Sequence, residues 1–223
     1  MHDSKGVSVE ALPPGVEVED LNKAAGSDIL VLAVPVQRME ALLKQLAPLL
    51  AMRKTPALVL DVASVKARPV ALMRDLLPPQ TEIIGTHPLF GPQSGKDGIA
   101  GFPIALCPVR VGPESLTCVR SFLSGKLGLK VIDVDPEEHD RLMAYVQGLT
   151  HLISRAVGEM PLPHTELATA AYRRFLDMRG NLAGDSWDLF VTIERENPFA
   201  PDVRRQLREK LEEIEQRLNS GGR

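Results

Sequence analysis

One histidine stands out as a candidate for acid–base chemistry. His87 lies in the segment Gly-Thr-His-Pro-Leu-Phe-Gly-Pro-Gln-Ser-Gly, residues 85–95, and the proline after it holds the histidine backbone extended. A short apolar run precedes the histidine, so we expect it at the carboxyl end of a strand, inside a rigid loop. An imidazole with an ordinary pKa near ~6.5 can take up a proton at neutral pH. The alternative is a structural histidine that is hydrogen-bonded in a turn, but the position favours function.

Two further segments follow predicted strands, and open parallel sheets bind ligands outside the carboxyl ends of their strands. Ala33, Val34 and Pro35 form a small, bent, apolar segment against which a flat ring could lie, although a strand end closed by proline is the simpler explanation of these residues taken alone. Asp61 and Ser64 follow the next strand. Either side chain could cap the following helix, or the Ser64 hydroxyl could donate to a ligand in a cleft. The spacing leaves both interpretations open.

A polar stripe runs along a predicted long helix after residue 135. Gln147 and His151 are four residues apart and share one helical face. Exposed helix faces usually carry Lys and Glu, so glutamine and histidine here favour a partly buried surface that faces a ligand; a solvated stripe is the alternative. No carboxylate-rich shell accompanies the histidines, and no metal site is predicted. His139, among acidic residues, is expected at a solvated helix start.

The elements that must position these residues alternate in the first half of the chain. Short apolar runs predict strands at residues 28–34, 57–61, 82–85, 102–107 and 130–133, with helices at 39–50, 65–77 and 114–127. This alternation predicts an α/β fold with a parallel sheet. From residue 136 only helical patterns occur, at 136–159, 165–178, 185–194 and 201–218. We therefore expect an α/β domain over residues 1–134 and an all-helical domain over residues 135–223.

Composition narrows the class of protein. The 223 residues carry a net charge of −3 and no long basic run, which argues against nucleic acid as a partner. The longest strongly apolar run, residues 29–36, is far shorter than the about 20 residues that cross a bilayer, so no membrane association is expected. The N-terminus has no apolar signal segment. Two cysteines form no disulfide framework, which favours a cytoplasmic protein.

The motifs in order resemble the prephenate/arogenate dehydrogenase family of tyrosine biosynthesis. They are Asp61-x-x-Ser-x-Lys, the His87 segment, Glu-Glu-His139-Asp-Arg, Gln147-x-x-Thr-His, and Asp185-Ser-Trp-Asp-Leu. The resemblance implies a Rossmann-like domain and a helical domain that forms a homodimer. It also implies NAD- or NADP-dependent oxidative decarboxylation of prephenate or arogenate, a cyclohexadienol with a ring carboxylate.

The resemblance assigns roles to individual residues. His87 would accept the proton of the substrate hydroxyl, and Ser64 would hydrogen-bond near that hydroxyl and orient it. Three residues of the long helix would face the substrate, namely Gln147, Thr150 and His151. The cofactor would be contacted by Ala33, Val34, Pro35 and Asp61.

The sequence departs from the family pattern in two places. Prephenate-using members often hold a substrate carboxylate with an arginine where this chain has Asn181, with Arg179 two residues away, so the choice of substrate stays open. No G-x-G-x-x-G turn occurs, which predicts an incomplete Rossmann-like domain without its first βαβ unit, and a truncated product. One alternative is a cofactor-free binding or regulatory module. Another is a hydroxy-acid or imine dehydrogenase, which would carry a lysine or aspartate where the long helix has Gln147 and His151.

Overall fold

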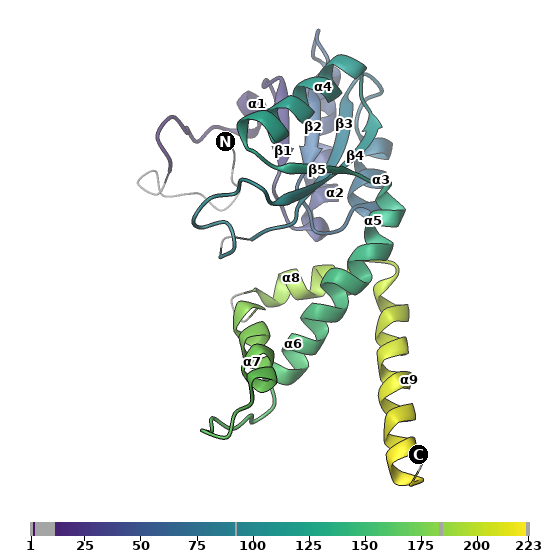
Figure 1. The fold of residues 1–223 in the computed structure, drawn as a ribbon. Coiled ribbons are helices and arrows are strands. Elements are labelled where there is room, and N and C mark those ends of the chain that lie inside the picture. The colour runs from purple at the N-terminus through teal and green to yellow at the C-terminus, as the bar shows by residue number, and fades with distance from the viewer. Residues whose placement is uncertain (1, 3–11, 92, 183–184, 222–223) are drawn as a thin grey trace.

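The structure of the protein is a computed structural model. It describes residues 2, 12–91, 93–182 and 185–221, and for residues 178–182 it describes the backbone alone. Within these residues the chain forms a sheet flanked by helices, followed by a group of helices that lies below the sheet in Figure 1. The predicted α/β fold with a Rossmann-like sheet and a following helical part is confirmed, with one difference in strand direction.

The sheet holds five strands in the order β1-β2-β3-β4-β5. Their bounds are β1 Ile29–Leu32, β2 Leu58–Asp61, β3 Glu82–Pro88, β4 Pro103–Arg110 and β5 Lys130–Asp133. All neighbouring strands are parallel except β3 and β4, which run antiparallel. The prediction of a wholly parallel sheet is wrong for this pair. The described residues of the connection between β3 and β4 form no helix, and a parallel pair requires a long crossover connection, usually a helix.

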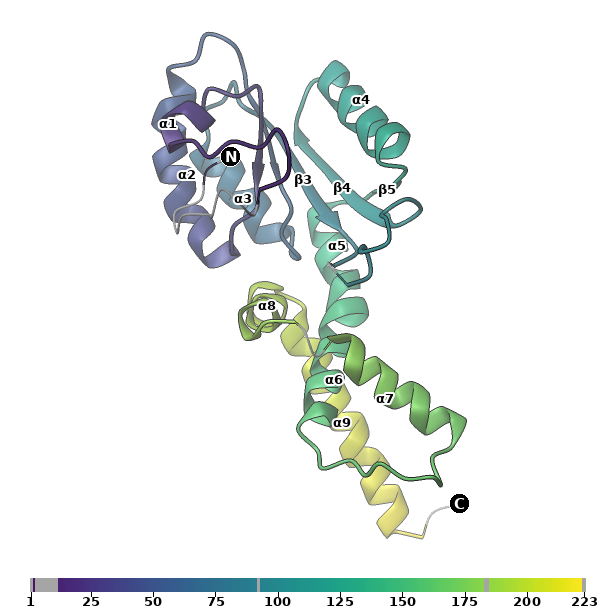
Figure 2. The same ribbon diagram turned by 90° about the vertical axis from the view of Figure 1, so that its left-hand side faces the viewer.

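Helices cover both faces of the sheet, as Figure 2 shows for α2 and α3 on one side and α4 on the other. Their bounds are α1 Leu21–Ala24, α2 Val36–Ala51, α3 Ala67–Leu76 and α4 Pro113–Ser121, which continues into the π-helical turn η2 Phe122–Lys126. Met39, Leu43, Leu46 and Leu50 line one face of α2 and are buried against the sheet. Burying each such side chain stabilises the fold by about 1.5–3 kcal/mol.

One long helix leads away from the sheet and matches the predicted helix 136–159. It consists of α5 Pro136–Met143, the π-helical segment η3 Ala144–Leu149 and α6 Thr150–Gly158. It begins at Asp135, whose carboxylate accepts hydrogen bonds from the main-chain N–H groups of Glu137 and Glu138. This side chain satisfies two amides that the first turn of a helix leaves unpaired.

The remaining helices pack around this one. They are α7 Ala170–Leu182, α8 Trp187–Val191, the π-helical segment η4 Thr192–Glu196 and α9 Ala200–Asn219. In Figure 1 α9 extends away from the rest of the molecule. Two parts of the helical group return to the sheet domain, because α5 contacts α3 and η4 contacts α2. These two contacts place helical side chains beside the carboxyl ends of the parallel strands, where the candidate residues lie.

Candidate active site

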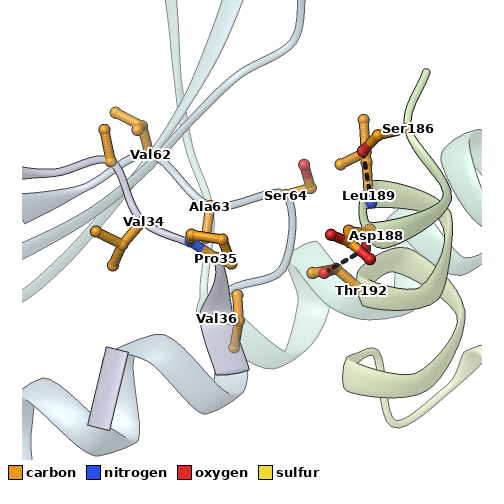
Figure 3. Close-up of a pocket in the computed structure, with 11 residues that line it drawn as sticks. Val34, Pro35, Val36, Val62, Ala63, Ser64, Ser186, Asp188, Leu189 and Thr192 are labelled. Carbon is orange, nitrogen blue, oxygen red and sulfur yellow. Dashed lines mark hydrogen bonds between the residues drawn. The ribbon is translucent and has the colours of Figure 1, made fainter. Parts of the chain in front are cut away.

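A cleft of about 380 Å³ lies between the sheet and the helical group. One wall comes from the chain just after β1 and β2, and the other from α8 and η4 (Figure 3). The sheet wall is almost wholly apolar, with Ser64 as its one hydroxyl. The residues of this wall are Ala33, Val34, Pro35, Val36, Val62, Ala63 and Ser64. The segment predicted to accept a flat ring therefore lies in the cleft.

The opposite wall combines polar and apolar side chains, namely Ser186, Asp188, Leu189 and Thr192. The Ser186 hydroxyl accepts a hydrogen bond from the Leu189 N–H at 3.1 Å and so caps α8. The Thr192 hydroxyl donates to the main-chain oxygen of Asp188 at 2.8 Å. Both bonds appear as dashed lines in Figure 3. The sequence predicted a helix at 185–194 but named none of these four residues as cleft residues.

Arg155 fixes the α8 wall from behind. Its guanidinium lies 5.2 Å from the Trp187 ring centroid and 5.1 Å from that of Phe190. It also donates to the main-chain oxygen of Asp185 at 2.8 Å. A cation over two aromatic faces is held by the ring quadrupoles as well as by the hydrogen bond. The short α8 segment is therefore tied to α6 rather than free to move alone.

Ser64 presents its hydroxyl to the cleft and makes no hydrogen bond with any residue that the structure describes. Neither Ser64 nor Asp61 caps α3, although the spacing allowed it. The first N–H groups of α3 are satisfied instead by Asp140 of α5, which accepts from Lys66 N at 2.7 Å and from Ala67 N at 2.9 Å. Because a distant carboxylate supplies the cap, the Ser64 hydroxyl is available to a ligand.

His87 lies within β3, one residue before its end, and not in the loop that the sequence predicted. Pairing with β4 extends the strand to Pro88 and sets His87 opposite Ala105. The side chain is only 4% exposed and does not line the cleft described above. Burial first, and then the charges of His139 and Lys66, hold the pKa of His87 well below 6.5. The imidazole is therefore neutral at pH 7.

His87 and Ser64 nonetheless belong to the same edge of the sheet. Asp61 of β2 pairs with Gly85 of β3 in parallel register, so Ser64, three residues after β2, and His87, one residue before the end of β3, lie at the same ends of neighbouring strands. Lys66 connects the two positions. It stands at the start of α3, two residues after Ser64, and its ammonium donates to the main-chain oxygen of Thr86 at 2.5 Å, next to His87.

Lys66 and Asp61 form an ion pair with no exposure to solvent on either side chain. The Asp61 carboxylate also accepts from Ala63 N at 3.0 Å, and the Thr86 hydroxyl donates to the main-chain oxygen of Asp61. Burial raises the pKa of the Asp61 carboxyl, against the opposing effect of Lys66. Asp61 therefore lies behind the cleft and fixes its wall. The cofactor contact predicted for it stays a prediction.

The expectation that His139 lies at a solvated helix start is wrong. Its ring is 2% exposed, because the first turn of α5 packs against α3 beside the end of β3. His139 Nε2 lies 3.0 Å from His87 Nδ1, and His139 Nδ1 lies 2.8 Å from the Asp140 carboxylate. The sequence predicted no role for either His139 or Asp140. The available signal was that α5 starts directly after β5, which puts its first turn at the edge of the sheet.

The long helix carries Gln147, Thr150 and His151 further from the sheet, and none of the three lines the cleft. Thr150 bonds back to the Val146 carbonyl at 2.8 Å. His151 is buried, with Nδ1 3.7 Å from the Asp185 carboxylate, and burial lowers its pKa more than Asp185 raises it.

The side-chain amide oxygen of Gln147 is buried and accepts no hydrogen bond from any described residue. The predicted substrate residues Arg179 and Asn181 have side chains outside the described part of the structure. Within that part, no group of three or more His, Cys, Asp or Glu side chains could hold a metal ion.

Comparison with protein families gives two matches. The family model described as "Prephenate dehydrogenase, nucleotide-binding domain" matches residues 2–132. A second model, described as "TYRAAT1-like, C-terminal domain", matches residues 156–222. Together the two matches cover the sheet domain and most of the helical group.

Known proteins similar to this chain include the chloroplastic arogenate dehydrogenase 2 of Arabidopsis thaliana. The two are 31% identical over 195 residues, which is 86% of this chain and 54% of the relative. This chain thus spans about half the length of that relative.

Two solved structures share the fold. The Synechocystis arogenate dehydrogenase is 25% identical with a TM-score of 0.66, over 92% of this chain and 76% of that chain. A prephenate dehydrogenase from Aquifex aeolicus, in complex with hydroxyphenyl propionate and NAD⁺, is 20% identical with a TM-score of 0.70, over 92% of this chain and 74% of that chain.

The family model covers more than half of the residues, and it includes both strand ends that carry Ser64 and His87. The order of motifs in the sequence agrees with it. The chain belongs to the prephenate dehydrogenase family.

Proposed function

We propose that this chain carries the substrate-side chemistry of an NAD(P)-dependent dehydrogenase that oxidatively decarboxylates prephenate or arogenate. The observation that carries the proposal is that a neutral, buried histidine and a free serine hydroxyl lie at the same ends of two neighbouring parallel strands. The names of its relatives, arogenate and prephenate dehydrogenases, support the same reaction.

The cleft fits one end of a nicotinamide dinucleotide. Its sheet wall of small apolar residues at strand ends could accept a flat ring, and Ala33, Val34 and Pro35 would hold it. When bound, the nicotinamide accepts a hydride from the substrate. The glycine-rich turn that binds a pyrophosphate does not occur in the sequence, so the residues present account for the ring end alone.

The chain's own residues would manage the proton and the orientation of the substrate. The substrate ring carries a hydroxyl on one carbon and a carboxylate on another. Loss of a hydride from the hydroxyl-bearing carbon, of the hydroxyl proton and of carbon dioxide leaves an aromatic phenolate, which becomes the phenol when a proton returns to its oxygen. Ser64 would donate to the hydroxyl oxygen and fix its position. His87 Nε2, which bonds no described residue, would take the hydroxyl proton.

A direct assay tests the proposal. The full chain is incubated with prephenate or with arogenate and with NAD⁺ or NADP⁺, and formation of the reduced cofactor is measured with the phenolic product. We expect product with one substrate at least, and the ratio of the two kcat/KM values gives the specificity. If the chain binds the substrate in calorimetry but forms no product with either cofactor, the dehydrogenase proposal fails for this chain.

The absent glycine-rich turn favours a second candidate function, a module that binds prephenate or tyrosine without any cofactor. The cleft and the histidine would then serve recognition only. Calorimetry separates the two functions. Binding of prephenate or tyrosine together with no binding of NAD⁺ or NADP⁺ favours this second candidate, and binding of either cofactor contradicts it.

We also propose that the helical group forms a homodimer. Large apolar side chains are exposed at the end of α5, on η3 and on α9, and η3 packs against α9. They are Leu142, Tyr145, Val146, Leu211, Ile214 and Leu218. Large exposed apolar patches mark protein interfaces, and neighbouring elements of the helical group carry these six side chains. Sedimentation of the wild type and of Ile214→Glu tests this: the proposal expects a dimer that the variant converts to monomer, and a monomeric wild type contradicts it.

No helix among the described residues is long and apolar enough to cross a bilayer. Both cysteines, Cys107 and Cys118, are free thiols. Free thiols suit a reducing compartment, and we propose the cytoplasm as the location. Fractionation of the native host with an antibody to the chain tests it, and recovery of the protein outside the cytoplasm contradicts it.

A further inference from the structure

We infer that His139 and Asp140 set the tautomer of His87, so that His87 carries its proton on Nδ1 and its lone pair on Nε2. His139 and Asp140 would then be positioning residues, since they act through His87. The tautomer itself is a property of the folded chain. Its consequence for catalysis rests on the proposed dehydrogenase function.

Hydrogen bonds hold the Asp140 carboxylate in a fixed position. Its Oδ1 accepts from Lys66 N at 2.7 Å and its Oδ2 from Ala67 N at 2.9 Å, at the start of α3. Asn197 donates to the main-chain oxygen of Asp140 at 2.7 Å. Asp140 itself has no exposure to solvent. Because two main-chain N–H groups bond the carboxylate and Asn197 bonds the main chain of Asp140, the carboxylate is held in one orientation.

The positions of the protons on the two histidines follow from which atoms can donate a hydrogen bond. A carboxylate accepts hydrogen bonds and donates none, so the 2.8 Å contact between Asp140 Oδ1 and His139 Nδ1 places a proton on that nitrogen. A neutral His139 then has its lone pair on Nε2. The 3.0 Å contact between His139 Nε2 and His87 Nδ1 therefore places the proton on His87 Nδ1. His87 Nε2 is left with the lone pair.

The competing arrangement has His139 doubly protonated. Its Nε2 would then donate to His87 Nδ1, and the His87 proton would sit on Nε2. That arrangement buries a second cation in the cluster that already holds Lys66, and both side chains are at most 2% exposed. Burial disfavours the charged form of a side chain. The distances are the same in both arrangements, and burial is what favours two neutral histidines bonded in series to the Asp140 carboxylate.

The arrangement also explains how a buried histidine could serve as a base. A proton taken up on Nε2 makes His87 an imidazolium, whose Nδ1–H still donates to His139. The hydrogen bond from His87 to His139 and the one from His139 to Asp140 connect the imidazolium to the Asp140 carboxylate, whose negative charge stabilises it. A carboxylate that fixes the tautomer of a histidine and stabilises its cation can matter by a factor of about 10⁴ in kcat.

The tautomer can be read without substrate or cofactor. The full chain is labelled with ¹⁵N-histidine, and long-range ¹H–¹⁵N NMR spectra report which ring nitrogen carries the proton. His87→Asn and His139→Asn each remove one set of signals and so assign the rest. We expect a protonated Nδ1 and an unprotonated Nε2 on His87. A proton on Nε2 of His87 overturns the inference, whether or not the chain is a dehydrogenase.

Two variants test which residues impose the tautomer. Asp140→Asn places an amide donor where a carboxylate accepted, and His139→Phe removes the acceptor beside His87 with a ring of similar size. In each, we expect a substantial His87 population with the proton on Nε2. Asp135→Asn is the matched control, because asparagine caps a helix as well as aspartate and the site lies outside the chain of bonds. A folded Asp140→Asn variant with an unchanged His87 tautomer overturns the role of Asp140.

Turnover supplies the second readout where the enzyme is active. We expect Asp140→Asn to lower kcat by about 10² to 10⁴ with the substrate dissociation constant nearly unchanged. Asp135→Asn should match the wild type. An equal loss in both variants, or a loss that follows only the melting temperature, indicates a structural role and contradicts the inference. If no variant shows activity, the NMR result still decides the tautomer.

Discussion

The buried ion pair between Lys66 and Asp61 makes a strong prediction about stability. Substituting methionine for Lys66 keeps an unbranched chain of similar length but removes the ammonium that bonds Asp61 and the Thr86 carbonyl. The Asp61 carboxylate, with no exposure to solvent, is then left without its counter-ion. Removing one partner of a buried pair costs about 3–5 kcal/mol in the free energy of unfolding. For a chain of this size each 1 kcal/mol corresponds to about 2–4 °C, so the melting temperature should fall by about 6–20 °C.

A second variant and a control make the test quantitative. The double variant Asp61→Asn/Lys66→Met removes both charges and should recover part of the loss, so the double-mutant cycle gives a coupling energy. Lys44→Met, at an exposed pair with Glu40 on α2, is the control and should cost under about 1 kcal/mol. Urea unfolding followed by circular dichroism measures the wild type, these three variants and the single variant Asp61→Asn, which completes the cycle. A Lys66→Met variant within about 1 kcal/mol of the wild type refutes the idea that this pair holds the site together.

The pH dependence of the Lys66→Met variant provides a further check. Burial raises the pKa of Asp61 above its ordinary value of 3.8, and losing Lys66 removes an opposing effect. The folded variant therefore binds a proton on Asp61 more readily than the unfolded chain does. That stabilisation is complete below pH 3.8 and is lost as the pH rises through the raised pKa of Asp61. The difference in the free energy of unfolding between the wild type and Lys66→Met should therefore grow from acid toward neutral pH. If this difference in the free energy of unfolding stays constant with pH, the raised pKa of Asp61 is contradicted.

Three further predictions concern the site and the core. Because burial lowers the pKa of His87, kcat should stay flat through neutral pH and fall only well below pH 6.5; a fall that begins at 6.5 contradicts a buried base. Ser64→Ala removes one hydrogen bond of about 0.5–1.5 kcal/mol and should lower kcat/KM by roughly 2- to 12-fold, measured in initial-rate assays; an unchanged value removes Ser64 from the site. Leu43→Ala empties a fully buried position of α2 and should cost about 2–5 kcal/mol in urea unfolding, and a smaller loss would mean that the core closes over the cavity.

Much of the architecture follows from local patterns in the sequence. The apolar run that predicted a strand at 57–61 became β2, with every residue buried. The apolar positions from Met39 to Leu50 became the buried face of α2. Residues predicted for the ring-binding segment and Ser64 lie in the cleft, because strand ends of a parallel sheet meet at one edge.

The antiparallel pairing of β3 with β4 was not predictable from the same patterns. Both strands are short, apolar and buried, and such runs look alike whichever way they pair. The pairing lengthens β3 to Pro88 and so places His87 inside the sheet rather than in the following loop. Direction depends on the connection between the strands, and the one available signal was that no helix is predicted between residues 85 and 102, which disfavours a parallel pair.

Local sequence patterns could not predict the contacts of Asp140, because these contacts join residues far apart in the chain. It caps α3 across 74 residues of sequence, while the rules for helix caps refer to residues within one turn of the helix. His139 looked like a solvated residue among acidic neighbours, because its burial depends on where α5 meets α3. Side chains that join two domains are determined by tertiary packing, and spacing along the chain does not show them.

In the proposed reaction His87 takes a proton from the substrate at the junction of the sheet and the helical group. Single-turnover assays of His87→Asn with prephenate and with arogenate test it most directly, alongside calorimetric substrate binding. Turnover should fall by about 10² to 10⁴ while the substrate dissociation constant changes little. Turnover close to the wild-type value in a folded variant would contradict the claim.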